Sequence, residues 1–200
     1  MESGHTVLST PRLVLRAWRA ADLRPFAALN ADPEVMRHFP ACLSQAASER
    51  LAERIAAGIA ARGFGLWALE VPGVAAFIGF LGLSVPAFAP PFESAAAPCV
   101  EIGWRIARRH WGQGYASEAG RAVLGHAFET LMLPEVVAFT VPANVRSLAV
   151  MRRLGMRASP DDDFLHPLLP AGHPLAPHVL YRLTAAEWRA RPGARGCAGT

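Results

Sequence analysis

One stretch, residues 99–131, constrains this chain more than any other because it joins three patterns without a break. It opens with a run that alternates apolar side chains with Glu101, Gly103 and Arg105, as a β-strand requires. A basic turn with two glycines follows, and apolar residues then recur at helical spacing. The order of strand, glycine-bearing loop and helix N-terminus suits an anion, because backbone N–H groups and the helix dipole can reach it.

The loop runs from Arg108 to Ala116 and reads R-R-H-W-G-Q-G-Y-A. It is not a Walker loop, because the chain contains no lysine. It is a poor dinucleotide-binding fingerprint, since Ser117 stands where the third glycine belongs. Taken alone, the glycines are explained equally well by an ordinary strand-to-helix turn.

The residues around the glycines are similar to the acyl-CoA-binding loop of the GNAT acetyltransferases, whose pattern is Gln/Arg-x-x-Gly-x-Gly/Ala. Two registers fit: Arg109 with Gly112 and Gly114, or Trp111 with Gly114 and Ala116. We favour the second register. It reproduces the W-G-x-G-[aromatic or aliphatic]-A-x-E-A of the branch that resembles ribosomal-protein N-terminal acetyltransferases.

The resemblance extends over residues 10–185 in the order of the family. Its further motifs are T-x-R-L-x-L-R, E-I-G-[aromatic], N-x-x-S and L-G-[F/M], which correspond here to 10–16, 101–104, 144–147 and 154–156. The resemblance implies an α/β GNAT fold with a mixed, mostly antiparallel sheet flanked by helices. It also implies transfer of an acetyl group from acetyl-CoA to a primary amine, either a protein N-terminus or a small molecule.

The resemblance also implies a set of residues that bind acetyl-CoA. They comprise the end of the strand, the loop and the cap of a later helix: Trp104, Arg105, Ile106, Arg109, His110, Trp111, Gly112, Gln113, Gly114, Tyr115, Ala116 and Asn144. Asn144 has an alternative role as a plain helix N-cap. The neighbouring Glu118, in the first helical turn, is expected to be structural.

Two residues are candidates for catalysis. Glu101 is a lone carboxylate in an apolar strand just before the loop, where burial can raise its pKa toward the range of a general base. The alternative is that Glu101 lies on a polar sheet face and pairs with an arginine. By the resemblance, Ser147 is the candidate that protonates the departing sulfur. Many members of the family use a tyrosine four residues further on, where this chain has Met151.

Composition limits the class of protein. Two hundred residues, 52% apolar and 18% charged, predict one globular domain over 1–200, with a core at about 10–190 and a frayed tail at 191–200. The net charge of +4 suits an anionic ligand without requiring nucleic acid. The scattered histidines and three widely spaced cysteines predict no metal site and a reduced, cytoplasmic protein. No signal peptide or membrane span is expected.

Periodicity and turn residues predict the elements. Strands are expected at 12–18, 64–71, 75–85, 99–107, 135–141, 156–159 and 178–183, and helices at 22–30, 33–38, 44–62, 116–131, 144–154 and from 184. Asp22, Asn144 and Thr184 are the expected caps. An insert at 86–98 and a long connection at 161–177 have no assigned role.

Three other functions compete with an acetyltransferase. A non-catalytic acyl-CoA-binding or sensor domain would use the same loop without Glu101 and Ser147. A nucleotide-binding oxidoreductase would need a parallel sheet and a glycine loop near the N-terminus, whereas this loop lies past mid-chain. An arginine-rich nucleic-acid binder would need aromatic residues interleaved with the arginines. The chain is expected to act as a monomer or homodimer.

Overall fold

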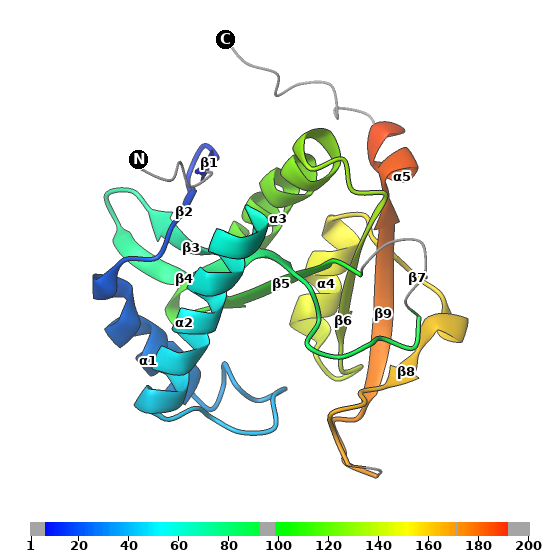
Figure 1. Ribbon diagram of the computed structural model, residues 1–200, viewed down its shortest axis with the longest axis horizontal. Helices are drawn as coiled ribbons and strands as arrows, with labels where there is room; N and C mark the ends of the chain where they lie inside the picture. The colour runs from blue at the N-terminus through cyan, green and yellow to red at the C-terminus, as the bar shows by residue number, and fades with distance from the viewer. Residues whose placement is uncertain (1–6, 93–98, 171, 192–200) are drawn as a thin grey trace. The chain divides into compact units, whose positions relative to one another are not determined.

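The computed structural model describes residues 7–92, 99–170 and 172–191 (Figure 1). The chain forms two compact units, the first made of 1–84 and 102–122 and the second of 85–101 and 123–200. Of the predicted frayed tail at 191–200, Arg191 is described and donates to the carbonyls of Leu154 and Gly155, so it is not frayed. Residues 192–200, with Cys197 among them, and residues 93–98 of the insert lie outside the described residues.

The first unit is built on antiparallel strands covered by two helices. The strands are β1 (Leu8–Ser9), β2 (Val14–Arg16), β3 (Leu66–Val71) and β4 (Ala75–Ser84), each paired with the next. β5 (Glu101–Ile106) continues the ladder beside β4. The helices are α1 (Leu23–Ala31) and α2 (Gln45–Arg62), and η1 (Ala20–Asp22) is a short 3-10 turn before α1.

The bounds of α2 follow from local chemistry, as predicted. The Ser44 side chain accepts a hydrogen bond from the N–H of Ala47 at 3.2 Å, which caps the first turn. Gly63 ends the helix at a φ of 74°, a left-handed conformation that a residue with a Cβ rarely adopts. Ile55 and Ile59 are buried on the inner face.

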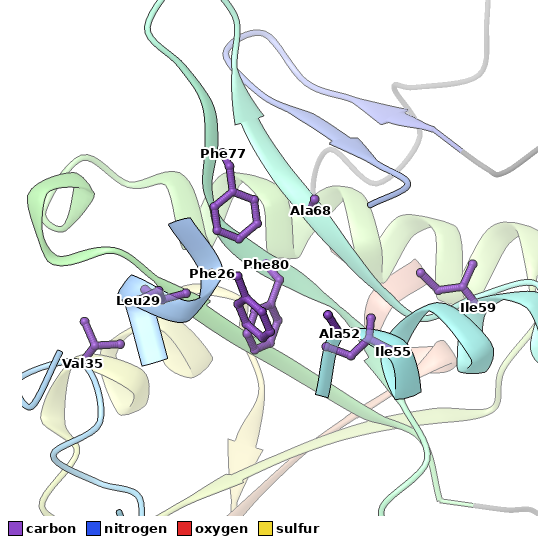
Figure 2. Close-up of a cluster of buried hydrophobic side chains, with 9 residues drawn as sticks. All are labelled: Phe26, Leu29, Val35, Ala52, Ile55, Ile59, Ala68, Phe77 and Phe80. Atoms are coloured by element: carbon purple, nitrogen blue, oxygen red, sulfur yellow. The ribbon is translucent and has the colours of Figure 1, made fainter. Parts of the chain in front are cut away.

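A cluster of apolar side chains joins these helices to the sheet (Figure 2). Phe26 of α1 lies against Phe77 and Phe80 of β4, with ring centroids 6.4 and 5.9 Å apart. Ile55 of α2 belongs to the same cluster, and Trp111 of the glycine loop packs against it. The core of the first unit therefore also supports the loop.

The second unit contains the strands that follow β5 and includes a parallel pair. The strands are β6 (Glu135–Thr140), β7 (Arg157–Ala158), β8 (Phe164–Leu165) and β9 (Pro177–Thr184). β9 pairs antiparallel with the other three, and β6 and β9 lie side by side (Figure 1). Glu101, the first residue of β5, pairs in parallel with Val137 of β6.

Three helices complete the chain: α3 (Tyr115–Gly125), α4 (Val145–Arg153) and α5 (Ala185–Arg189). Thr184 and Glu187 form the predicted capping box before α5.

The strands pair into the predicted mixed, mostly antiparallel sheet, which is flanked by helices. Such a sheet is not the parallel sheet that the oxidoreductase alternative requires. Among the described residues, no helix is both long and apolar enough to cross a bilayer.

Several local predictions were wrong. Residues 33–38 form turns rather than a helix: Met36 N–H donates to the Asp32 carbonyl, but one such turn does not propagate. The helix expected at 116–131 changes at His126–Thr130 into a π-helix, where Phe128 packs on Trp188 at 5.7 Å. β1 and β8 are short strands that the pattern did not indicate.

The cap predicted at Asp22 was also wrong, because its carboxylate is used elsewhere. Both of its oxygens accept from the Arg16 guanidinium, at 2.8 and 2.9 Å. Arg16 also donates to Glu70 at 2.7 Å and to the carbonyl of Ala76. Arg16 and Asp22 are 4% and 2% exposed. This buried ion network ties β2 to β3, β4 and the start of α1.

Replacing Arg16 should therefore cost far more stability than replacing a neighbouring surface arginine. Arg16→Leu leaves the buried Asp22 carboxylate without its partner and should lower the free energy of unfolding by about 3–5 kcal/mol. Arg19 is largely exposed and reaches the same Glu70 at 3.1 Å, so Arg19→Ala should cost less than about 1 kcal/mol. Urea denaturation of both variants measures the difference; equal losses would contradict a structural role for the network.

Candidate active site

The first part of the glycine loop is anchored to the end of β5. After Ala107 the chain makes a 3-10 turn, η2 (Arg108–His110), and Trp111 then folds back, its indole N–H donating to the Ile106 carbonyl at 2.7 Å. Gly112 and Gly114 have φ angles of 75° and 82°. These left-handed conformations turn the backbone sharply into α3, and glycine adopts them without steric cost.

The loop presents a row of backbone donors. Among the described residues, no backbone carbonyl accepts from the N–H groups of residues 112–117. The first N–H groups of a helix have no partner within it, and they carry the positive end of its dipole. Gly112, Gln113 and Gly114 are exposed, so their donors are open to a ligand. This row is the arrangement that holds a phosphate.

Arg12 and Glu118 hold the loop in this shape. The Glu118 carboxylate accepts from the Thr10 hydroxyl at 2.7 Å and from Arg12 Nε at 2.6 Å and backbone N–H at 3.0 Å. Arg12 also donates to the Gln113 carbonyl at 3.0 Å. Burial alone would raise the pKa of Glu118, but the hydrogen bonds from Thr10 and Arg12 outweigh it and lower that pKa.

Glu118 is thus structural, as predicted, but the role of Thr10 and Arg12 was missed. The motif that contains these two residues carries meaning in the sequence only through the family resemblance. Their partner lies more than a hundred positions away in the chain. No local signal in the sequence connects them.

The basic side chains of the loop differ in protonation and in ion pairing. Arg109 is exposed, and its Nε donates to Nε2 of His110 at 3.0 Å. Burial, and then the charge of Arg109, lowers the pKa of His110, which is therefore neutral at pH 7. Arg108 lies 3.6 Å from Asp32, which offsets part of its charge. Arg108 and Arg109 are both exposed, so both cations of the loop are accessible.

The Arg105 side chain is engaged away from the loop. It donates to the Asn30 side-chain oxygen at 2.5 Å and lies over the rings of Phe39 and Phe80, at 4.2 and 5.5 Å. Burial lowers its pKa to about 10. A contact of Arg105 with acetyl-CoA would therefore come from its backbone. Ile106 is buried, so its contact with acetyl-CoA would also come from its backbone. Trp104 is half-buried.

Glu101 has the electrostatics predicted for a base. No arginine pairs with it in the described part of the chain, so the alternative of a surface ion pair is not observed. Part of the residue's surface remains accessible. The carboxyl itself is packed closely enough that burial raises its pKa to about 8.

Asn144 and Ser147 lie at the start of α4 in the second unit. The Asn144 side-chain oxygen accepts from the Ser147 N–H at 3.3 Å, and its amide donates to the Thr140 hydroxyl at 3.0 Å. Asn144 is thus a helix N-cap, whether or not it also contacts a ligand. Within the described residues the half-buried Ser147 hydroxyl makes no hydrogen bond. Met151 is 2% exposed and belongs to the core.

No metal-binding cluster accompanies these residues. Within the ranges that the structure describes, no three His, Cys, Asp or Glu side chains are grouped so as to hold an ion. The loop and the end of β5 belong to the first unit, and Glu101, Asn144 and Ser147 belong to the second.

Comparison with known proteins gives the family. Residues 12–157 match the model of the acetyltransferase (GNAT) domain. A Bacillus subtilis protein described as uncharacterized, YkkB, is 30% identical over 155 residues, which cover 77% of this chain and 87% of that protein. An acetyltransferase from Agrobacterium tumefaciens matches with a TM-score of 0.71 and 27% identity, covering 92% of this chain and 96% of the other.

A more distant structure has the same fold. Spermidine N-acetyltransferase from Vibrio cholerae, solved in complex with CoA and spermine, aligns with a TM-score of 0.68 at 18% identity, covering 90% of this chain and 99% of the other. The domain match spans most of this chain and agrees with the sheet and the glycine loop described above. The chain therefore belongs to the GNAT family and is an acetyl-CoA-dependent acyltransferase.

Proposed function

We propose that the protein transfers the acetyl group of acetyl-CoA to a primary amine by direct attack, with Glu101 as general base. The observation that carries this proposal is an unpaired carboxyl with a pKa of about 8 at the start of the strand that leads into the donor loop. The acceptor is a small-molecule amine or a protein N-terminus. The whole chain acts as one cytoplasmic domain, as a monomer or homodimer, in the ribosomal-protein N-terminal acetyltransferase branch.

The residues of the loop fit the anionic part of CoA. The open N–H groups between Gly112 and Ser117 would bind phosphate oxygens, and the accessible Arg109 adds charge beside them. The backbone of Trp104–Ile106 would align the pantetheine arm. Asn144 would contact CoA in addition to its role as a cap.

The chemistry needs one proton to leave and one to arrive. The acceptor nitrogen bonds to the acetyl carbon, the carbon–sulfur bond breaks, and the sulfur leaves with the electron pair. Glu101, directly or through a water, takes the proton from the nitrogen. Ser147 donates a proton to the sulfur, because Met151 at the usual tyrosine position cannot. The competing idea of a non-catalytic CoA-binding domain requires that neither residue affect turnover.

The loop assignment predicts that Gly114→Val abolishes acetyl-CoA binding. Valine is strained at the φ of 82°, and its side chain would block the close approach of a phosphate to the backbone. Gly73→Val is the matched control, because Gly73 has a φ of 74° but lies in the β3–β4 turn. Calorimetry should show lost affinity only in the Gly114 variant. Unchanged affinity there would overturn the loop assignment.

Ser147→Ala should lower kcat more than it lowers the affinity for acetyl-CoA, since only the transition state needs the proton. Asn144→Ala, which removes the cap, should instead cost about 1 kcal/mol of stability. Steady-state kinetics and thermal unfolding separate the two effects. If the Ser147 variant keeps the turnover and pH profile of the wild type, water rather than Ser147 supplies the proton.

Glu101→Gln keeps the shape of the side chain and removes its basicity. It should cut turnover on the order of a hundredfold or more just above pH 8, where the wild-type carboxyl is ionised and can accept the proton. The loss should shrink at still higher pH, where free amine is abundant. With a weakly basic acceptor such as 2,2,2-trifluoroethylamine, kcat/KM of the wild type should rise with pH through about 8 as Glu101 ionises. Parallel profiles with equal rates would leave Glu101 a structural residue.

The same pKa gives a check that is independent of activity. The folded carboxyl keeps its proton up to about pH 8, whereas the unfolded one loses it near 4.5. The native state therefore binds more protons between these values, and wild-type stability should fall there as pH rises. Glu101→Gln should not show this loss in urea denaturation.

A further inference from the structure

Six aromatic rings, termed here the aromatic cluster, gather in the second unit: Phe88, Phe92, Phe139, Phe164, His166 and His178. They come from separate segments, namely the described part of the insert, β6, β8, the connection after β8, and β9. Their closest ring centroids are 4.6 Å apart for Phe88 and His166, and 5.0 Å apart for both Phe92 with Phe164 and His166 with His178. The insert and the connection, for which the sequence indicated no role, thus meet in one cluster.

The aromatic cluster is not simply a second core. Each of its six residues keeps part of its surface accessible to solvent. Val137 and Leu180, on the same strands, are 3% and 0% exposed. Four of the ten phenylalanines of the chain therefore lie in a cluster that is only partly buried.

The aromatic cluster lies on the same sheet face as Glu101. Glu101 pairs directly with Val137, so their side chains point to one side, and Phe139 follows two residues later on that side. Phe139 pairs with Leu180, which puts His178 on this face as well. From strand spacing, the Cα atoms of Glu101 and Phe139 are about 8 Å apart.

Backbone contacts determine the tautomers of the two histidines. Nδ1 of His166 accepts from the Leu168 N–H at 3.3 Å, so its proton lies on Nε2. Nδ1 of His178 lies 3.0 Å from the Ala176 carbonyl, which can only accept, so Nδ1 carries the proton and Nε2 is bare. Burial is the main reason that the pKa of each histidine is lowered, so both are neutral at pH 7.

The charge beside the aromatic cluster is already balanced. The Arg182 guanidinium lies 5.4 Å from the centre of the Phe92 ring. It donates to Glu135 at 2.8 Å and to Asp162 at 2.9 Å. A surface of neutral rings with a compensated cation at its edge attracts a flat, uncharged group rather than a second charge.

We propose that the aromatic cluster recognises an aryl group of the acceptor, so that this protein acetylates primary amines that carry an aromatic ring a short distance from the nitrogen. The inference rests on the proposed function, because Glu101 on the same face defines where the amine reacts. The ring can belong to a small arylalkylamine or to the N-terminal residue of a peptide. Edge-to-face contacts with the phenylalanines supply the recognition.

The test compares acceptors with and without a ring. The pairs are phenethylamine with propylamine, and a peptide beginning with Phe with one beginning with Ala. Wild-type protein should show kcat/KM at least about fivefold higher for the ring-bearing member of a pair. A preference within the amine pair alone identifies a small-molecule acceptor, and one within the peptide pair identifies an N-terminal residue. Equal values within both pairs overturn the inference.

A variant of Phe164 tests whether the preference for a ring comes from the aromatic cluster. Phe164→Leu keeps an apolar side chain and removes the ring, so KM for phenethylamine should rise while KM for propylamine and acetyl-CoA stays unchanged. Leu165→Ala is the control, because Leu165 neighbours Phe164 in β8 and is 68% exposed. Equal KM values for phenethylamine in wild type and Phe164→Leu would contradict the assignment of the ring to this cluster.

A binding measurement separates this inference from the proposed function. Calorimetry in the presence of CoA should show phenethylamine binding to wild type and to Leu165→Ala, and weaker binding to Phe164→Leu. Aryl binding without acetyl transfer to any amine would refute the proposed function and leave the aromatic cluster as a ligand site. Acetyl transfer without any preference for a ring would refute the role of the aromatic cluster in acceptor recognition and leave the proposed function standing.

Discussion

The candidate site depends on a row of backbone N–H groups that stays open at the start of α3. Donors without acceptors cost free energy when they are buried, and a loop left to itself tends to fold over them. Here the positive φ angles of Gly112 and Gly114 turn the chain outward, and the Trp111 side chain holds the loop to the end of β5. The Glu118 carboxylate, held by Thr10 and Arg12, fixes the first turn of α3 from the other side.

Whether a buried charged group has a partner separates the structural residues from the candidate functional ones. The buried Arg16 and Asp22 and the half-buried Glu70 form a network in which each charge has a partner, so they stabilise the fold. Glu101 is a buried carboxyl without such a partner in the described residues, and burial moves its pKa to about 8. A group that is costly to ionise near neutral pH is a poor structural element but a suitable proton acceptor.

Much of the fold was predictable because its signals are local. Ser44 and Gly63 mark the ends of α2, and Thr184 with Glu187 marks the start of α5; each of these contacts spans only a few residues. The turns at 33–38 and the π-helix at His126–Thr130 were not predictable from spacing. A helical pattern does not show whether a single turn will propagate, or which distant side chain, such as Trp188, will pack on it.

By itself the sequence determined the order of strand, glycine loop and helix, and the family to which this order belongs, because alternation, glycine and caps act through neighbours in the chain. Only the tertiary structure decided which charges are paired and which rings meet. Arg12 reaches Glu118, and Phe88 reaches His166, across long stretches of chain. Burial of Glu101 likewise depends on neighbours that folding brings around it. Such contacts are set by packing of separate elements, which no local pattern encodes.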